Sequence, residues 1–146
     1  MPFIAICGGG GKSTIVKKYP HKFIDIDDFI WSSENKSYHK KLSTALKDEN
    51  YDSIGNIYQE ILSNNKKLQS ENKIILGHHP INAKWIGIPH ILNIRPIKEL
   101  HLKNIEKRDD KMRKLAIDSW NNLNGQKKFE YKNYREFENL LLNIYF

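Results

Sequence analysis

The sequence predicts an α/β fold with three layers (α/β/α), in which helices flank a central parallel sheet of about five strands. Short apolar runs alternate with helical patterns along the chain, and a strand, a glycine run, a helix and a second strand follow one another within the first 27 residues. Two strands joined by a helix lie parallel in one sheet, and ligands bind such sheets beyond the carboxyl ends of the strands. We therefore expect the glycine run at a ligand-binding edge.

The first unit is predicted to be a strand, a helix and a strand, at residues 3–7, 13–19 and 22–27. Pro20 ends the helix because proline restricts the residue before it and lacks a backbone donor. Asp25 and Asp27 lie two positions apart on the predicted second strand, so both side chains should point to the same side. Together with Asp28 they are expected on the same sheet edge as the glycines.

The middle of the chain is predicted to hold two helices, a strand, an ordered turn and a further strand, at residues 38–47, 53–64, 73–77, 85–89 and 90–94. The helices of region 32–72 either pack on the sheet, or the first of them forms a flap over a second substrate. His78 and His79 end the third strand. Neighbouring strand residues face opposite sides, so the pair is a poor site for one metal ion. Either one histidine contacts substrate, or the pair has a capping or loop role.

The last third is predicted to be a long helical stretch, a strand and a closing helix, at residues 97–123, 128–131 and 134–145. A charged run at residues 107–111 divides or bends the helical stretch. Its apolar side is predicted to include Met112 and Leu115. Arg108 and Arg113 flank the corner, either as part of a solvated charged turn or as groups that neutralise a bound phosphate.

Length and composition predict one domain over residues 1–146 of a protein in the cytoplasm. The net charge of +7 suits anionic partners such as nucleotides or nucleic acid, or it reflects a solvated lysine surface. A single cysteine allows no intramolecular disulfide and suits a reducing compartment. No apolar run approaches the ~20 residues that span a bilayer, and no signal-peptide pattern is present, so no membrane partner is expected.

The most specific motif is the run Gly8-Gly9-Gly10-Gly11-Lys12-Ser13-Thr14. Successive glycines let the backbone bend tightly, so that its N–H groups can point at a phosphate chain. Lys12 adds a mobile positive charge, and the Ser13 hydroxyl at the start of the next helix can ligate Mg²⁺. The pattern predicts a phosphate-binding loop.

This run departs from the pattern G-x-x-x-x-G-K-[ST] at one position, because Ile6 stands where the first glycine is expected. Either the loop is one residue shorter and opens at Cys7 or Gly8, or Ile6 has an unusual backbone conformation. We favour the shorter loop. Cys7 is expected to pack in the core rather than to react.

These residues resemble the P-loop kinases of small molecules, the group that contains nucleotide kinases, shikimate and gluconate kinases and polynucleotide 5′-kinases. The resemblance rests on the glycine motif, on Asp25-Ile26-Asp27 and on two arginines in the place of a lid, within residues 97–123. It implies that ATP phosphates are bound by Gly8, Gly9, Gly10, Gly11, Lys12, Ser13 and Thr14. It implies that Mg²⁺ is held by Ser13 and Asp25. Catalytic roles are implied for Lys12, Asp27, Arg108 and Arg113.

In that group Lys12 would contact the β- and γ-phosphates, and Asp27 would orient or deprotonate the acceptor hydroxyl. The expected activity is Mg²⁺- and ATP-dependent phosphoryl transfer to a nucleotide, a nucleoside or a nucleic-acid 5′ end. The alternatives are a small-metabolite kinase of the shikimate or gluconate type, a nucleotide-binding protein without turnover, and a subunit whose loop serves an assembly. The third strand ends without the acidic residue that often assists Mg²⁺ binding in such proteins.

Overall fold

The computed structural model of the chain describes residues 2–65, 72–123 and 128–144. Five strands form one sheet: β1 (Phe3–Ile6), β2 (Phe23–Asp25), β3 (Ile74–Gly77), β4 (His90–Pro96) and β5 (Lys128–Tyr131). All neighbouring strands pair in parallel, in the order β2-β3-β1-β4-β5. The predicted α/β fold with a parallel sheet of about five strands is confirmed.

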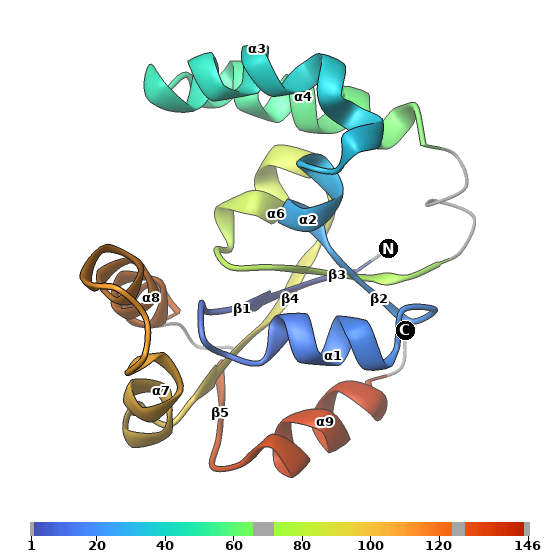
Figure 1. Cartoon of the computed structure of the whole chain (residues 1–146). Helices are drawn as coiled ribbons and strands as arrows, with labels where there is room; N and C mark the ends of the chain where they lie inside the picture. Colours follow the sequence, from blue (N-terminus) through green and yellow to red (C-terminus); the bar gives the residue numbers. More distant parts are fainter. Residues whose placement is uncertain (1, 66–71, 124–127, 145–146) are drawn as a thin grey trace.

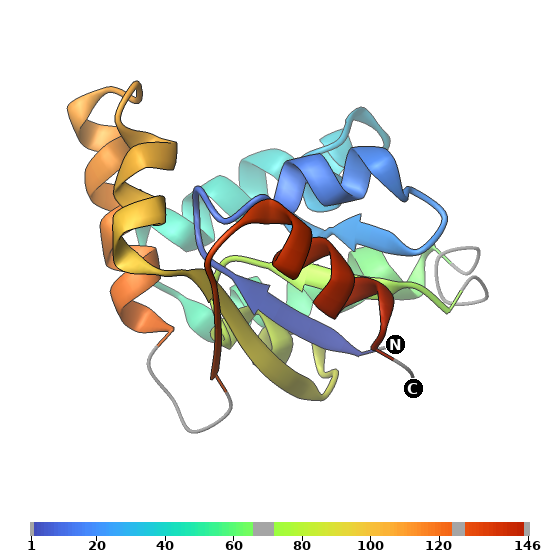
Figure 2. The ribbon, with the colours of Figure 1, turned by 90° about the horizontal axis from the view of Figure 1, so that it is seen from below.

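Helices connect these strands and cover the sheet. Their bounds are α1 (Lys12–Lys18), α2 (Ile26–Ile30), the 3₁₀ turn η1 (Ser33–Asn35), α3 (Lys36–Lys47), α4 (Tyr51–Ser63), α6 (Ile81–Ile86), α7 (Lys98–Ile105), α8 (Asp110–Asn122) and α9 (Tyr134–Leu142). Figure 1 shows α2, α3, α4 and α6 on one side of the sheet, with α1 and α9 on the other. Helices α7 and α8 stand beyond the carboxyl ends of the strands, as the view in Figure 2 also shows.

Strand β1 lies at the centre of the sheet and is buried on both faces. Its alternate side chains Phe3 and Ala5 pack into the core beneath α2, α3, α4 and α6. Ile4 and Ile6 point the other way, into the core shared with α1 and α9. This explains why β1 reads as a continuous apolar run rather than an alternating one. Because α1, which follows β1, and α6, which follows β3, lie on opposite sides of the sheet, a crevice opens between the carboxyl ends of these two neighbouring strands.

The second strand is shorter than the predicted range 22–27. The Asp25 side chain accepts hydrogen bonds from the backbone N–H groups of Asp27 and Asp28, so Asp25 caps a helix that starts at Ile26. Ile26 and Ile30, four residues apart, are both buried against the core. The prediction that Asp27 lies on a strand is therefore wrong, because a side-chain cap overrides the apolar alternation.

The predicted turn at residues 85–89 is also wrong in part, because α6 runs from Ile81 to Ile86. Pro80 occupies the N-cap position, and Gly87 ends the helix with a φ of 70°. Ala83 and Ile86 bury one side of this short helix.

The long helical stretch breaks where the charged run predicted it, between α7 and α8. Met112 and Leu115 do not face the core, however, and are 47% and 54% exposed. The predicted helices at residues 38–47 and 53–64 correspond to α3 and α4, and α9 ends at Leu142. Tyr145 and residues 66–71 lie outside the described residues. No helix in the described part of the chain is long and apolar enough to cross a membrane.

Candidate active site

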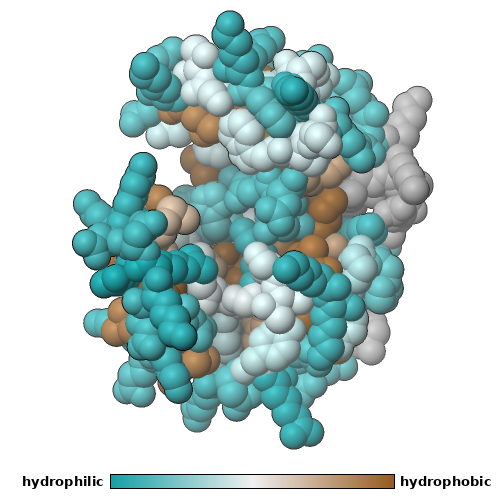
Figure 3. Space-filling view, in the orientation of Figure 1, coloured by the Kyte–Doolittle hydropathy of each residue, from teal (hydrophilic) through white to brown (hydrophobic). Residues whose placement is uncertain are grey.

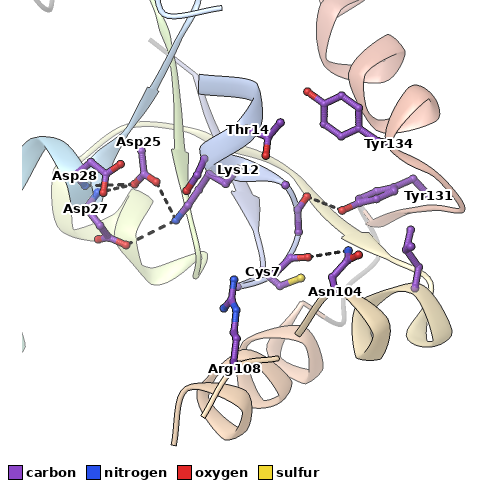
Figure 4. A pocket seen from close by; sticks show the side chains of 16 residues that line it. Cys7, Lys12, Thr14, Asp25, Asp27, Asp28, Asn104, Arg108, Tyr131 and Tyr134 are labelled. Carbon is purple, nitrogen blue, oxygen red and sulfur yellow. Dashed lines mark hydrogen bonds and ion pairs between the residues drawn. The ribbon is translucent and has the colours of Figure 1, made fainter. Parts of the chain in front are cut away.

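A cavity of about 600 Å³ opens at the carboxyl edge of the sheet, where the glycine-containing connection meets β2, α7 and β5. It is lined by Cys7, Gly8, Gly9, Gly10, Gly11, Lys12, Ser13, Thr14, Asp25, Asp27, Asp28, Leu100, Asn104, Arg108, Tyr131 and Tyr134. Figure 4 shows Lys12 directed at the aspartates, with Tyr131 and Tyr134 on the other side of the cavity. Most of the residues predicted for the site therefore meet in one place.

The connection between β1 and α1 consists of residues 7–11, here called the glycine loop. Ile6 remains in β1 and pairs with Ile94 of β4, so it does not open the loop. The loop turns at Cys7, whose carbonyl accepts a hydrogen bond of 3.0 Å from the N–H of Gly10. Our preference for a shorter loop is confirmed. Cys7 itself is fully buried, and burial raises the pKa of its thiol to about 12, which agrees with a packing role.

Three successive carbonyl groups of the glycine loop are held by side chains from outside it. His101 Nε2 donates to the carbonyl of Gly8 at 2.8 Å, and Asn104 Nδ2 donates to that of Gly9 at 3.1 Å. The hydroxyl of Tyr131 donates to the carbonyl of Gly10. These three residues were not identified from the sequence as part of the site. The one signal in the sequence is that His101 and Asn104 are three residues apart, on the same face of a helix.

The orientation of these carbonyl groups leaves N–H groups of the loop available to a ligand. In a trans peptide the N–H points opposite to the preceding carbonyl, so the N–H groups of Gly9 and Gly11 point away from the donors on α7 and β5. Within the described residues, neither N–H has a hydrogen-bond acceptor. The N–H groups of Lys12 and Ser13, at the start of α1, likewise have none. Such a cluster of backbone donors suits an anion.

The Lys12 side chain extends toward two of the aspartates. Its Nζ lies 3.4 Å from Oδ2 of Asp25 and 3.9 Å from Oδ2 of Asp27. Lys12 begins α1, whose buried Ile15 anchors the helix to the sheet. The exposed Ser13 and Thr14 complete the first turn of that helix and line the cavity.

The aspartates differ in ionisation because their surroundings differ. Burial raises the pKa of Asp25, an effect that Lys12 only partly offsets. Burial also acts to raise the pKa of Asp27, but the hydrogen bond and charge of His78, together with the charge of Lys12, outweigh it and lower that pKa below the usual value. Asp27 is therefore an ionised carboxylate near neutral pH. Although Asp27 lies on α2 instead of β2, it reaches the same cavity as Asp25.

The two histidines after β3 take different roles. His78 Nδ1 lies 2.7 Å from Oδ2 of Asp27, and because a carboxylate only accepts, the imidazole donates. His79 Nδ1 accepts from the N–H of Ile81 at 3.0 Å, in the turn that leads into α6. Of the two roles left open by the sequence, His79 has the capping role and His78 belongs to the site.

The two arginines of the predicted lid region are not equivalent. Arg108, in the turn between α7 and α8, lines the cavity. Arg113 does not line it. Its Nη2 donates to the carbonyl of Arg108 at 2.9 Å and lies 3.5 Å from Oδ1 of Asp110. Arg113 therefore holds the turn that carries Arg108.

Ser119 of α8 joins the glycine loop to the end of β3. Its hydroxyl accepts from the N–H of Gly8 at 3.2 Å and donates to the carbonyl of His78 at 3.2 Å. Ser119 is buried, so these contacts are shielded from water. No sequence pattern pointed to it.

The donor set fits Mg²⁺ only in company with phosphate. Among the described residues, no three His, Cys, Asp or Glu side chains are grouped so that they could hold a metal ion by themselves. Mg²⁺ usually binds through one or two protein oxygens plus substrate phosphates. The Ser13 hydroxyl and the Asp25 carboxylate, beside the free N–H groups of the loop, suit that mode of binding.

Comparison with known proteins adds no family. No protein-family model matches the chain, and no curated protein is similar to it in sequence. The fold and the cavity therefore define its class: an α/β protein with an all-parallel sheet, in which a glycine loop and three aspartates meet at the carboxyl edge.

Proposed function

We propose that this protein transfers the γ-phosphoryl group of ATP, with Mg²⁺, to a nucleotide, a nucleoside or a nucleic-acid 5′ end. One observation carries the proposal: side chains of α7 and β5 hold the carbonyl groups of Gly8, Gly9 and Gly10, while N–H groups of the loop stay free beside Lys12. This arrangement supports binding of a phosphate chain, as does the resemblance to P-loop kinases.

The roles follow from position in the cavity. The loop N–H groups and Lys12 would bind the phosphates, and Lys12 would exchange its contacts with Asp25 and Asp27 for phosphate oxygens. Ser13 and Asp25 would hold Mg²⁺, which neutralises part of the phosphate charge when bound. Arg108 enters the cavity from the α7–α8 turn, and would contact the phosphoryl group during transfer. Asp27 would accept or orient the proton of an acceptor hydroxyl.

The test supplies purified protein with Mg²⁺ and γ-labelled ATP, and offers nucleoside monophosphates, nucleosides, 5′-hydroxyl oligonucleotides and small hydroxylated metabolites. We expect label on one acceptor class. Lys12→Ala should lower the rate by at least ~10²-fold, because it removes the positive charge that would stabilise the transferred phosphoryl group. Lys17→Ala, which alters an exposed lysine on the same helix, should retain the wild-type rate.

Transfer only to small hydroxylated metabolites would support the small-metabolite kinase instead. ATP binding without transfer to any acceptor would contradict the proposal and support a nucleotide-binding protein. Equal rates for Lys12→Ala and Lys17→Ala would remove Lys12 from the mechanism.

A further inference from the structure

The charges that line the cavity bear on the kind of acceptor it admits. Among its described lining residues, Lys12 and Arg108 are the only cations, whereas Asp25, Asp27 and Asp28 are three carboxylates. The triphosphate of ATP needs both cations for itself. An acceptor whose reacting group is itself a phosphate or carboxylate would bring further negative charge to the aspartates without a partner, and unpaired like charges in a partly buried site are costly.

One oxygen of Asp27 is fixed and the other is available. Oδ2 receives the Nδ1–H of His78 at 2.7 Å and lies 3.9 Å from Lys12 Nζ. No side chain or backbone donor among the described residues contacts Oδ1. Since the backbone N–H of Asp27 donates to Asp25 at 3.0 Å, the residue is anchored at both its backbone and its carboxylate. A carboxylate held in this way presents one free oxygen to a ligand.

His78 is tied to the phosphate site through its backbone. Ser119 accepts from Gly8 in the glycine loop and donates to the His78 carbonyl, each at 3.2 Å. His78 therefore holds the Asp27 carboxylate with its side chain. Its main-chain carbonyl is joined to the glycine loop through the buried hydroxyl of Ser119. This linkage fixes the distance between the loop and the carboxylate, as in-line transfer requires.

We propose, on the basis of the proposed function, that the acceptor atom is an uncharged hydroxyl oxygen and that His78 is a positioning residue which holds Asp27 toward it. In the transfer step, Oδ1 of Asp27 takes the hydroxyl proton. The acceptor oxygen forms a bond to the γ-phosphorus, while the bond from that phosphorus to the β–γ bridging oxygen breaks. The products are a phosphate monoester and ADP, and Asp27 releases its proton to water.

The first experiment compares acceptors of matched structure: nucleosides against their 5′-monophosphates, 5′-hydroxyl against 5′-phosphorylated oligonucleotides, and metabolite alcohols against their phosphates. We expect labelled product only from the acceptors that have a free hydroxyl, and no phosphate, at the reacting position. The pair that gives product shows whether that hydroxyl belongs to a nucleoside, an oligonucleotide or a metabolite. Transfer only to the phosphorylated members would overturn this inference but leave the kinase proposal intact. No transfer to any acceptor would overturn both.

The second experiment tests His78 with the acceptor found in the first. His78→Ala should lower kcat about tenfold and leave the KM for ATP within about twofold, because a hydrogen bond to a charged group is lost from the acceptor side only. His78→Asn keeps a donor near the position of Nδ1 and should recover most of the loss. His21→Ala, a change at an exposed histidine between α1 and β2, should match the wild type.

His78 is exposed enough that its variants should fold, which thermal unfolding of each will check. Equal impairment of His78→Ala and His78→Asn would overturn the positioning role. An unchanged kcat in His78→Ala would do the same.

Discussion

At the scale of single residues, two glycines decide the shape of the loop. Gly9 and Gly11 have φ values of 78° and 89°, which side chains other than glycine rarely adopt. A Cβ on Gly9 would lie 2.5 Å from Cγ2 of Ile105, the residue that ends α7. Gly9 therefore permits both the turn of the chain and the close approach of α7 to the loop.

Replacement of Gly9 by alanine should cost more stability than the same replacement of Gly8. Gly9→Ala should lower the free energy of unfolding by roughly 1–3 kcal/mol, through the left-handed backbone and the clash with Ile105. Gly8→Ala, whose added Cβ would meet Ala116 at an ordinary 3.5 Å, should change it by less than ~0.5 kcal/mol. Urea denaturation of both variants tests this. Equal losses would mean that Gly9 is not specifically required.

At the scale of elements, α7 and the turn after it line the site, and α8 contacts the glycine loop through Ser119. Trp120 of α8 donates its Nε1–H to the carbonyl of Pro96 at 2.8 Å, and the Arg95 guanidinium lies 3.7 Å from the centre of the Trp120 ring. His101 joins α7 to the glycine loop, and Trp120 joins α8 to the end of β4. Figure 3 shows small hydrophobic patches among hydrophilic side chains over these helices. Met112 and Leu115 of α8 are exposed hydrophobic residues.

Arg108, in the turn between α7 and α8, and Arg113, in the first turns of α8, should have different effects. Arg108→Ala should lower kcat at least tenfold, with a smaller change in the KM for ATP, because its contact strengthens as charge develops in the transferred group. Arg113→Ala should have a weaker effect in the same direction, since it loosens the turn that carries Arg108. The exposed Arg135→Ala on α9 is the control. Steady-state kinetics that show an effect on KM alone would make both arginines ground-state binding residues.

His101 should make the attachment of α7 sensitive to pH. Burial lowers its pKa below 6.5, and the charges of Arg108 and Arg95 act in the same direction, although the hydrogen bond to Gly8 opposes them. The unfolded chain therefore binds this proton at higher pH than the folded protein. The free energy of unfolding should be highest above pH 6.5 and fall as the pH drops toward the folded pKa, by about 1.4 kcal/mol for each unit that separates the two values.

Urea unfolding at about pH 7.5 and about pH 5.5 measures this loss. His101→Gln keeps an N–H donor but has no titration, so it should lose less stability between the two pH values than the wild type. Burial and the charge of His78 also lower the pKa of His79, so part of the dependence should remain in the variant. An identical pH dependence in both proteins would rule out a contribution from His101.

At the scale of the whole molecule, the site gathers the ends of three strands and parts of four helices. Ligand binding at such a junction should stabilise the native state as a unit. With ATP and Mg²⁺ at 100 times the dissociation constant, the free energy of unfolding should rise by ~2.7 kcal/mol. EDTA should reduce the gain, because removal of Mg²⁺ would leave the Asp25 carboxylate facing the phosphates as an unscreened like charge.

Thermal unfolding with and without Mg²⁺-ATP measures this gain. Lys12→Ala should show little of it, while the exposed Lys17→Ala should show all of it. An equal shift in both variants would mean that the nucleotide binds elsewhere.

The parts of the site that could be predicted from the sequence are those encoded in one short segment. The glycine loop, Lys12 and the aspartates lie within 28 residues, and glycine conformation and apolar periodicity act over such distances. The five strands and most helices were predictable for the same reason. The start of α2 at Ile26 could not be predicted in this way. The alternating apolar residues of this segment fit a strand as well as they fit a helix capped by Asp25.

The sequence by itself determined the parallel sheet and the glycine loop with Lys12 at its carboxyl edge. Only the tertiary structure decided what surrounds that loop. Ser119, His101, Asn104 and Tyr131 contact glycines that are 111, 93, 95 and 121 residues away in the chain, and His78 meets Asp27 across 51 residues. Such contacts depend on how the strands are ordered and where α7 and α8 pack, and no local spacing encodes either.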